Sequence, residues 1–388
     1  MHPPPPNSTP PVRYARGVEV PEKGETETRD ALVASLHSIC ETTFKHAGHG
    51  VRSAHAKCYR LLLAELVVAD DVAPAMAPGI FAMPARWRVL MRLFSIPGDI
   101  LDDSASTPRS LTSKVVGGGG EHLAGSHGAV THDCVLANSA LFPSPDAKTL
   151  LSSLKLLAAT TDTVPNLKSA SSAVLCGTER VVVAFGGESA TLNGPGDQPK
   201  THIPGETFFS QAPLLYGPSM AELSVAPVSV ELAALKNAPL HVNGKPNGLR
   251  DAVLDFFDHP GAAWALRVQR CTDLENMPIE DASACWPADR CLCASVARTV
   301  AAPQPGWSKV RSAAIDDGMP FKPWHGVSAH RPIGSVRRVR KLVCDLSARF
   351  RARHNGRRVT APAGPAGPAG PADWPACAPA KTPAKASR

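Results

Sequence analysis

The chain has 388 residues, of which 43% are hydrophobic and 19% are charged, and its formal net charge is +7 at pH 7. This composition suits a globular core and excludes a small disulfide-stapled scaffold, because the ten cysteines are spread over a chain long enough to bury its own core. No apolar run approaches the ~20 residues that a membrane span needs. The first six residues lack the basic and apolar regions of a signal peptide, so we expect a cytoplasmic location without a membrane partner.

The two ends of the chain are rich in proline and poor in large apolar residues. Residues 1–24 are polar and proline-rich, and residues 359–388 contain Gly-Pro-Ala triplets followed by lysines. Such segments cannot bury a core, so we predict a disordered tail at each end and one folded domain over residues 25–358. The triplets are too few for a stable collagen helix.

Between these tails, the spacing of apolar residues predicts both helices and strands. Leu32, Leu36, Ile39 and Cys40 recur at helical spacing and predict a helix over residues 30–44. Apolar or alternating runs predict strands at residues 62–68, 89–95, 264–270 and 294–300, the last two paired in one sheet. Strands and helices alternate without a repeating βαβ unit, which is typical of the α+β class.

Two further helices are predicted from capping residues and apolar spacing. Ser144, followed by proline and aspartate, predicts a helix start with serine as the cap and proline in the first turn. The last helix has apolar residues at Val336, Val339, Val343, Leu346 and Phe350. Arg340 and Cys344 lie four residues apart and so share an adjacent face. The other basic residues of this helix predict a solvated face, and we expect no nucleic-acid partner because no aromatic residues interleave with them.

Three of the ten cysteines cluster, namely Cys285, Cys291 and Cys293. A zinc site there would need a fourth ligand at a recognisable spacing, and Cys-x-Cys is not the usual pair of zinc ligands. We therefore interpret these residues as reduced thiols on or near a strand and keep zinc as the alternative.

Arginine and histidine form the pattern that points most directly to chemistry. His55 follows Arg52 by three residues, which sets a group able to transfer protons beside a fixed cation. Arg92 and Arg340 are distant in sequence, and guanidinium groups bind carboxylates with two parallel hydrogen bonds. These arginines predict a shared anionic ligand. Cys344, one helical turn after Arg340, adds a soft ligand to the same neighbourhood.

Several ordered blocks of sequence between Thr43 and Gly356 resemble catalase-related haem proteins, and in particular the shorter, catalase-like branch of that family. Among these blocks are residues 94–104, 146–148, 205–213, 277–283, 316–319, 321–325 and 330–340. The resemblance implies an antiparallel eight-stranded β-barrel with helices packed outside it. It also implies a haem b group, with its iron, buried at the edge of the barrel.

The same resemblance implies roles for individual residues. His55 matches the distal histidine that moves a proton between the two oxygens of a peroxide. Arg52 and Arg92 match arginines that hold the haem propionates, and we assign Arg340 to the same task. Phe142 resembles a phenylalanine that packs on the porphyrin. The simpler alternatives are a structural histidine, ordinary ion pairs and ordinary core packing.

The sequence departs from this pattern at the residue that binds the iron. Where the family has an axial tyrosine, this chain has Cys344, and none of its three tyrosines stands at that place. Cysteine thiolate is a competent axial ligand, and Arg340 favours the thiolate by charge attraction. Cysteine is also shorter than tyrosine by a whole ring, so the replacement equally fits a site that has lost its haem.

The distal side departs from the family as well. No asparagine stands where true catalases have one, and Thr131 is the nearest polar residue, which we take as its replacement. Phe94 stands where a small hydroxyl residue is usual, and Ser110 where glycine is usual. These changes predict that the dismutation of hydrogen peroxide is weakened, whereas a peroxidase-type reaction is retained.

Our first hypothesis is therefore a haem-dependent, catalase-like oxidoreductase that acts on hydrogen peroxide or organic hydroperoxides in the response to oxidative stress. One alternative is a haem-free descendant in which the barrel is a structural or binding module. Another is a thiolate-haem peroxygenase or hydroperoxide isomerase. The sequence leaves homo-oligomerisation open.

Overall fold

The computed structural model describes residues 9–356, apart from residues 97, 99, 106, 127–129, 162–199, 289–292 and 305–312. The predicted tail at 359–388 and the first eight residues of the predicted N-terminal tail therefore lie outside the described residues.

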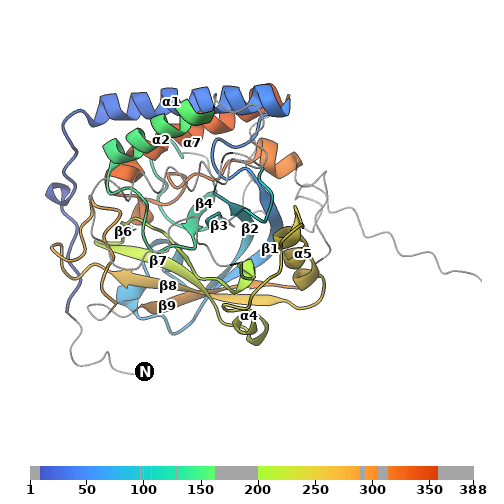
Figure 1. The fold of residues 1–388 in the computed structure, drawn as a ribbon. Coiled ribbons are helices and arrows are strands. Elements are labelled where there is room, and N and C mark those ends of the chain that lie inside the picture. The colour runs from blue at the N-terminus through green and yellow to red at the C-terminus, as the bar shows by residue number, and fades with distance from the viewer. Residues whose placement is uncertain are drawn as a thin grey trace, which may run out of the picture.

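The centre of the molecule is a closed antiparallel barrel of eight strands (Figure 1). The ring consists of β1 (Cys58–Val68), β2 (Ala85–Ser95), β3 (Arg109–Val116), β4 (Thr131–Ala137), β5 (Phe208–Phe209), β7 (Ser219–Pro227), β8 (Ala262–Arg270) and β9 (Ala294–Ala301). Neighbours follow the order β5-β4-β3-β2-β1-β9-β8-β7, and pairing of β5 with β7 closes the ring. A ninth strand, β6 (Leu214–Tyr216), pairs with β7 outside the ring. The predicted α+β class and eight-stranded barrel are confirmed.

The longest strands form because their apolar runs are buried along most of their length. β1 and β2 pair over nearly their whole length and contain the predicted strands at 62–68 and 89–95. β8 and β9 contain the other two predicted strands and pair with each other, as expected. Leu62 and Trp264 are fully buried in the core that these strands share.

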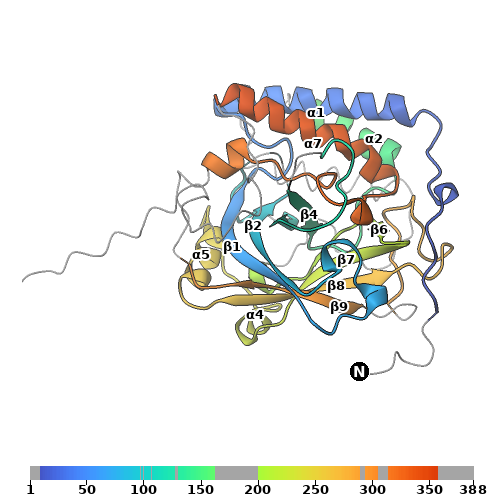
Figure 2. The ribbon, with the colours of Figure 1, turned by 180° about the vertical axis from the view of Figure 1, so that it is seen from behind.

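Three helices form a layer on one side of the barrel, as Figures 1 and 2 show. They are α1 (Glu25–Ala47), α2 (Ala147–Thr161) and α7 (Ser335–His354), and two shorter helices, α4 (Val230–Ala234) and α5 (Gly248–Asp258), lie elsewhere around the barrel. The helix predicted at 30–44 is the central part of α1. The predicted serine cap of α2 is wrong by two residues, because the backbone N–H of Thr149 donates to Asp146 Oδ1 at 2.8 Å. Asp146 therefore caps the helix, with Ser144 before it.

Short helical turns connect the longer elements. They are the 3₁₀ turns Arg16–Val18, Pro74–Met76, Gly79–Phe81, Ile203–Gly205 and Ser328–His330, and the π-helical turn Ala313–Asp317. None of the described helices is both long enough and apolar enough to cross a membrane.

Residues 9–24, which the sequence analysis assigned to the N-terminal tail, lie against the barrel and α7. The backbone N–H of Val12 donates to Cys271 O at 2.8 Å, and that of Tyr14 donates to Pro218 O at 2.9 Å. Further along the segment, Glu19 accepts hydrogen bonds from Arg331 and Arg338.

Arg338 of α7 joins three separate parts of the chain. Its guanidinium nitrogens lie 3.1 Å from Glu19, 2.7 Å from Glu25 at the start of α1, and 2.9 Å from Glu280. The Arg338 side chain is 16% exposed, so these ion pairs are largely shielded from water. Arg338 thus fixes the N-terminal segment and α1 to the last helix.

We expect Arg338→Ala to lower the free energy of unfolding by about 1–3 kcal/mol, because hydrogen bonds to charged groups are lost and three carboxylates keep no common partner. Arg338→Lys should restore only part of the loss, since one ammonium cannot reproduce the guanidinium fork. Denaturant titration measures both effects. A change below about 0.5 kcal/mol in Arg338→Ala, the usual range for surface substitutions, would contradict the assigned role.

The same network determines how the free energy of unfolding changes with pH. Burial raises the pKa of Glu19, but hydrogen bonds from Arg331, Tyr14 and Arg338 outweigh it and hold the pKa below its ordinary value. The stabilisation is therefore present above the ordinary pKa of a glutamate and is lost as the pH falls through the lowered value. The difference between wild type and Arg338→Ala should shrink in acid.

Candidate functional site

The site predicted from the arginine and histidine pattern lies between the barrel and the helical layer. The segment before β1 provides Arg52 and His55, and β2 provides Arg92. Helix α7 provides Arg340 and Cys344. The positive charges of Arg340, Arg92 and Arg52 all act on His55, so these groups share one neighbourhood.

His55 is held in an unusual backbone conformation. Its φ of +69° lies in the left-handed region, which residues other than glycine adopt rarely. Two hydrogen bonds fix this conformation, from His55 N to Ile96 O at 2.7 Å and from Arg92 Nη2 to His55 O at 2.9 Å. The imidazole ring packs on Phe94, with 4.7 Å between ring centroids. The ring position is therefore set by both backbone and packing.

The surroundings keep His55 neutral at pH 7. Burial lowers its pKa well below the usual 6.5, and the positive charges of Arg340, Arg92 and Arg52 lower it further. A neutral imidazole can accept a proton. Once protonated, the same ring is a stronger acid than an ordinary histidine.

Arg52 and Arg92 converge on one carboxylate, that of Asp316 in the π-helical turn. Arg92 Nε lies 2.6 Å from Asp316 Oδ1, and Arg52 Nε lies 3.7 Å from the same oxygen. Burial alone would lower the pKa of Arg92, but Asp316 raises it. The pKa of Arg52 is lowered by burial and by the charges of Arg351 and Arg92. Asp316 thus compensates Arg92 well and Arg52 only in part.

Arg351 is a member of this cluster that the sequence analysis did not identify. The prediction of a solvated face for the other basic residues of the last helix is wrong for Arg351. Its side chain is buried, and its guanidinium donates to Asp316 O at 3.0 Å and to Ser347 O and Oγ. Arg351 follows Cys344 by seven residues, which is two helical turns, so the two share a face. That spacing was the available signal.

Cys344 is half-buried on α7 and is a free thiol. Burial raises the pKa of this thiol, and Arg340 acts in the opposite direction without cancelling the effect of burial. The expected attraction between Arg340 and the thiolate is present, but it is too weak to hold the thiolate at neutral pH. Within the described part of the chain, Arg340 itself makes no hydrogen bond or ion pair.

Thr131 and Phe142 each have partners of their own among the described residues. Thr131 Oγ1 lies 2.9 Å from His325 Nδ1, at the end of β4 where Thr131 pairs with Val116 of β3. Phe142 packs in a small core with Val336 and other residues of α2, α7 and their loops. The structure therefore places Thr131 beside His325 and Phe142 in a small apolar cluster, and the roles predicted for both residues toward a haem stay predictions.

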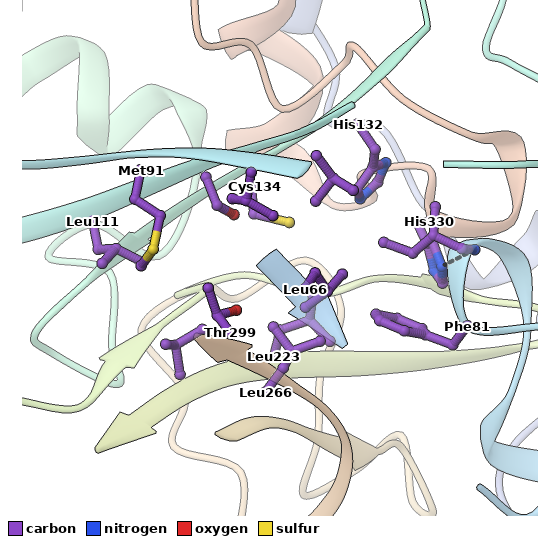
Figure 3. A pocket seen from close by; sticks show the side chains of 15 residues that line it. Leu66, Phe81, Met91, Leu111, His132, Cys134, Leu223, Leu266, Thr299 and His330 are labelled. Atoms are coloured by element: carbon purple, nitrogen blue, oxygen red, sulfur yellow. Dashed lines mark hydrogen bonds between the residues drawn. The ribbon is translucent and has the colours of Figure 1, made fainter. Parts of the chain in front are cut away.

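The interior of the barrel contains a separate cavity of about 20 Å³ (Figure 3). His132 and His330 lie at one side of it, opposite Leu223 and Leu266. Burial lowers the pKa of His132 to about 4 and that of His330 to about 3, so both are neutral at pH 7. The volume suits about one water molecule. A ligand larger than a water molecule does not fit in this cavity.

The predicted cysteine cluster gains no support as a metal site. Cys285 and Cys293 are exposed thiols, and Cys291 lies outside the described residues. Among the residues that the structure describes, no group of three histidine, cysteine or acidic side chains is arranged to hold a metal ion.

Comparison with known proteins identifies the fold. No family model matches the sequence, and no curated protein matches it. A fungal catalase is 16% identical over 87% of this chain and 70% of its own, with a TM-score of 0.55. Catalase A from Saccharomyces cerevisiae is 15% identical over 87% of this chain and 72% of its own, with a TM-score of 0.57. The catalase-like fold expected from the sequence blocks is therefore confirmed.

We expect Arg340→Gln to raise the pKa of His55, because a positive charge that disfavours the imidazolium is removed. Titration of the imidazole by NMR, with the signal assigned through His55→Ala, measures this shift. Arg349→Gln is the matched control, since Arg349 is exposed on the same helix. An equal pKa of His55 in wild type and Arg340→Gln would show that Arg340 is not close to the ring.

Proposed function

We propose that this catalase-fold chain binds haem b between the barrel and α7 and uses it to reduce hydrogen peroxide or an organic hydroperoxide. The observation that carries the proposal is the buried arginine cluster of Arg52, Arg92 and Arg351, next to a neutral His55 on the same side of the barrel. A positive cluster of this kind suits an anionic ligand, and the two carboxylates of haem b are of the right chemistry.

The donor set of the cluster fits a carboxylate-bearing ligand. Arg52 Nε is buried and has no hydrogen-bond partner, so it can donate to an added carboxylate oxygen. Arg52, Arg92 and Arg351 would hold the propionates. Arg340 also acts on His55 and Cys344, and its predicted part in holding a propionate stays a prediction.

Cys344 would be the residue that binds the haem iron, because it lies on the same helix as Arg340 and Arg351. Its thiol is protonated at neutral pH, so binding to iron has to release that proton. Bound haem would supply the redox chemistry that cleaves the O–O bond of a peroxide.

His55 would move the proton in that reaction. Its neutral ring accepts the proton of the first peroxide oxygen, since the pKa lies well below 6.5. The charges of Arg340, Arg92 and Arg52 disfavour the protonated ring, and so they favour passing the proton to the leaving oxygen. Phe94 limits the space beside the ring, which favours a single well-defined peroxide position.

A haem-free binding module is the second candidate, and one observation favours it. Asp316 already gives Arg92 a carboxylate partner at 2.6 Å, so the cluster is partly compensated by the chain itself. Haem content therefore separates the two candidates.

We expect one haem b per chain after reconstitution with haem, because the three buried arginines provide more positive charge than Asp316 compensates. A pyridine haemochrome assay together with the Soret absorbance measures the stoichiometry. Arg52→Gln should lower the occupancy, whereas Arg349→Gln, an exposed arginine on α7, should leave it unchanged. Haem below about one-tenth of the chain concentration would support the haem-free module instead.

Activity should depend on His55 and should be of the peroxidase type. His55→Ala should lower donor oxidation by about 10²–10⁴-fold at unchanged haem content, because proton transfer is lost. Oxygen release from hydrogen peroxide should be weak relative to donor oxidation, since Thr131, the nearest replacement for the distal asparagine, is bonded to His325. Vigorous oxygen release, or full activity in His55→Ala, would contradict this mechanism.

A further inference from the structure

The carboxylate of Asp316 lies where the forks of several buried arginines meet. Arg92 binds it at 2.6 Å, Arg52 approaches it to 3.7 Å, and Arg351 donates to the backbone carbonyl of the same residue. Asp316 therefore contacts every arginine of the cluster. The cluster carries three positive charges and this one carboxylate between them.

The arginines are anchored independently of the Asp316 side chain. Arg92 Nη2 donates to His55 O at 2.9 Å, and Arg52 Nη2 donates to Met319 O at 2.8 Å. Arg351 donates to Ser347 O at 3.0 Å. These bonds hold the guanidinium groups in place whether or not the Asp316 carboxylate stays between them. The cluster is thus a preformed anion site with an internal occupant.

Charge balance leaves this site short of negative charge. Asp317 also acts on Arg351, but it lies 2.9 Å from His49 and completes a separate pair. Even when Asp317 is counted, three arginines face two carboxylates. Consistent with this shortage of negative charge, Arg52 Nε is buried and makes no hydrogen bond to any of the described residues. A ligand with two carboxylates would supply the missing negative charge. A ligand without charged groups at these positions would not.

Asp316 lies on a short element outside the strands and long helices. It belongs to the π-helical turn Ala313–Asp317, and such turns are short and often lie at functional sites. Its side chain is 19% exposed, whereas that of Arg92 is 1% exposed. The Asp316 side chain is therefore more exposed than those of Arg92 and of Arg52, which is 11% exposed.

We propose that Asp316 is an internal counter-ion of the arginine cluster, and that a dicarboxylate ligand binds by displacing it. This inference rests on the proposed haem function for the identity of the ligand, namely the porphyrin with its two propionates. Asp316 then acts as a specificity-determining residue. A ligand without free carboxylates cannot replace it, because Arg92 and Arg52 would lose the carboxylate that they share.

The experiment compares the haem-free chain in wild-type form, as Asp316→Asn and as Asp317→Asn. The probes are haemin and haemin dimethyl ester, titrated by absorbance. Removing the internal competitor should tighten haemin binding by about tenfold in Asp316→Asn, the change that one charge-assisted hydrogen bond is worth. The ester should bind Asp316→Asn and wild type alike, and Asp317→Asn should tighten haemin binding less than Asp316→Asn, since Asp317 pairs with His49. Equal haemin affinity in wild type and Asp316→Asn would overturn the proposal.

A second measurement separates this inference from the haem hypothesis. Citrate, a small polycarboxylate, should raise the Tm of Asp316→Asn more than that of wild type or Asp317→Asn. If haemin binds none of the chains and citrate still distinguishes them, the haem function fails and the role of Asp316 stands. Equal citrate shifts in all three chains would reject Asp316 as a counter-ion.

Hydrogen exchange on the wild-type chain provides a test without any variant that could fail to fold. Displacement of Asp316 should speed exchange in residues 313–319 when haemin or citrate is added. Slower or unchanged exchange there, in the presence of bound ligand, would mean that Asp316 stays in place.

Discussion

Closure of the barrel depends on β5, a strand of only two residues. Phe209 pairs with Ala137 of β4 and with Ser224 of β7, and Phe208, fully buried, pairs with Val225. Without these pairings the sheet would have two free edges, and its two halves would not be held in a ring. The closed ring is a rigid wall, and the segment before β1, β2 and the π-helical turn present the site residues from that wall toward α7. Precise placement of His55 therefore follows from the closure of the whole barrel.

Electrostatic interactions then determine the protonation states of the site residues that the barrel holds in place. Burial and neighbouring cations act on the same groups in the same direction for His55 and Arg52, and both pKa values are lowered. For Cys344 the two effects oppose each other, and burial is the larger. The site is thus positive and poor in water, and it favours the neutral form of each titratable group that lacks a counter-ion. The chemistry of such a site suits an anionic ligand.

The sequence was sufficient to predict elements that depend on local patterns and residues that belong to a family motif. Strands at 62–68 and 89–95 followed from apolar runs, and the grouping of Arg52, His55 and Arg92 followed from the family pattern. The role of Arg351 did not, because the burial of an arginine depends on Asp316, a residue 35 positions earlier that no helical pattern connects to it. β5 was missed since two residues carry no periodicity. The start of α2 was predicted within two residues, because serine and aspartate are both good caps and only the hydrogen bond decides between them.

The network at Arg338 has a consequence for the order in which the molecule can assemble. Glu19 and Arg338 are 319 residues apart in the chain, and α1 packs against α7. During synthesis from the N-terminus, Leu32 and Leu36 of α1 have to wait for the last helix to emerge before their burial is complete. Contacts of such long range make folding slow and leave apolar surface open in the nascent chain. The burial of α1 is therefore completed only by the final helix, and loss of that helix would leave α1 packed against α2 alone.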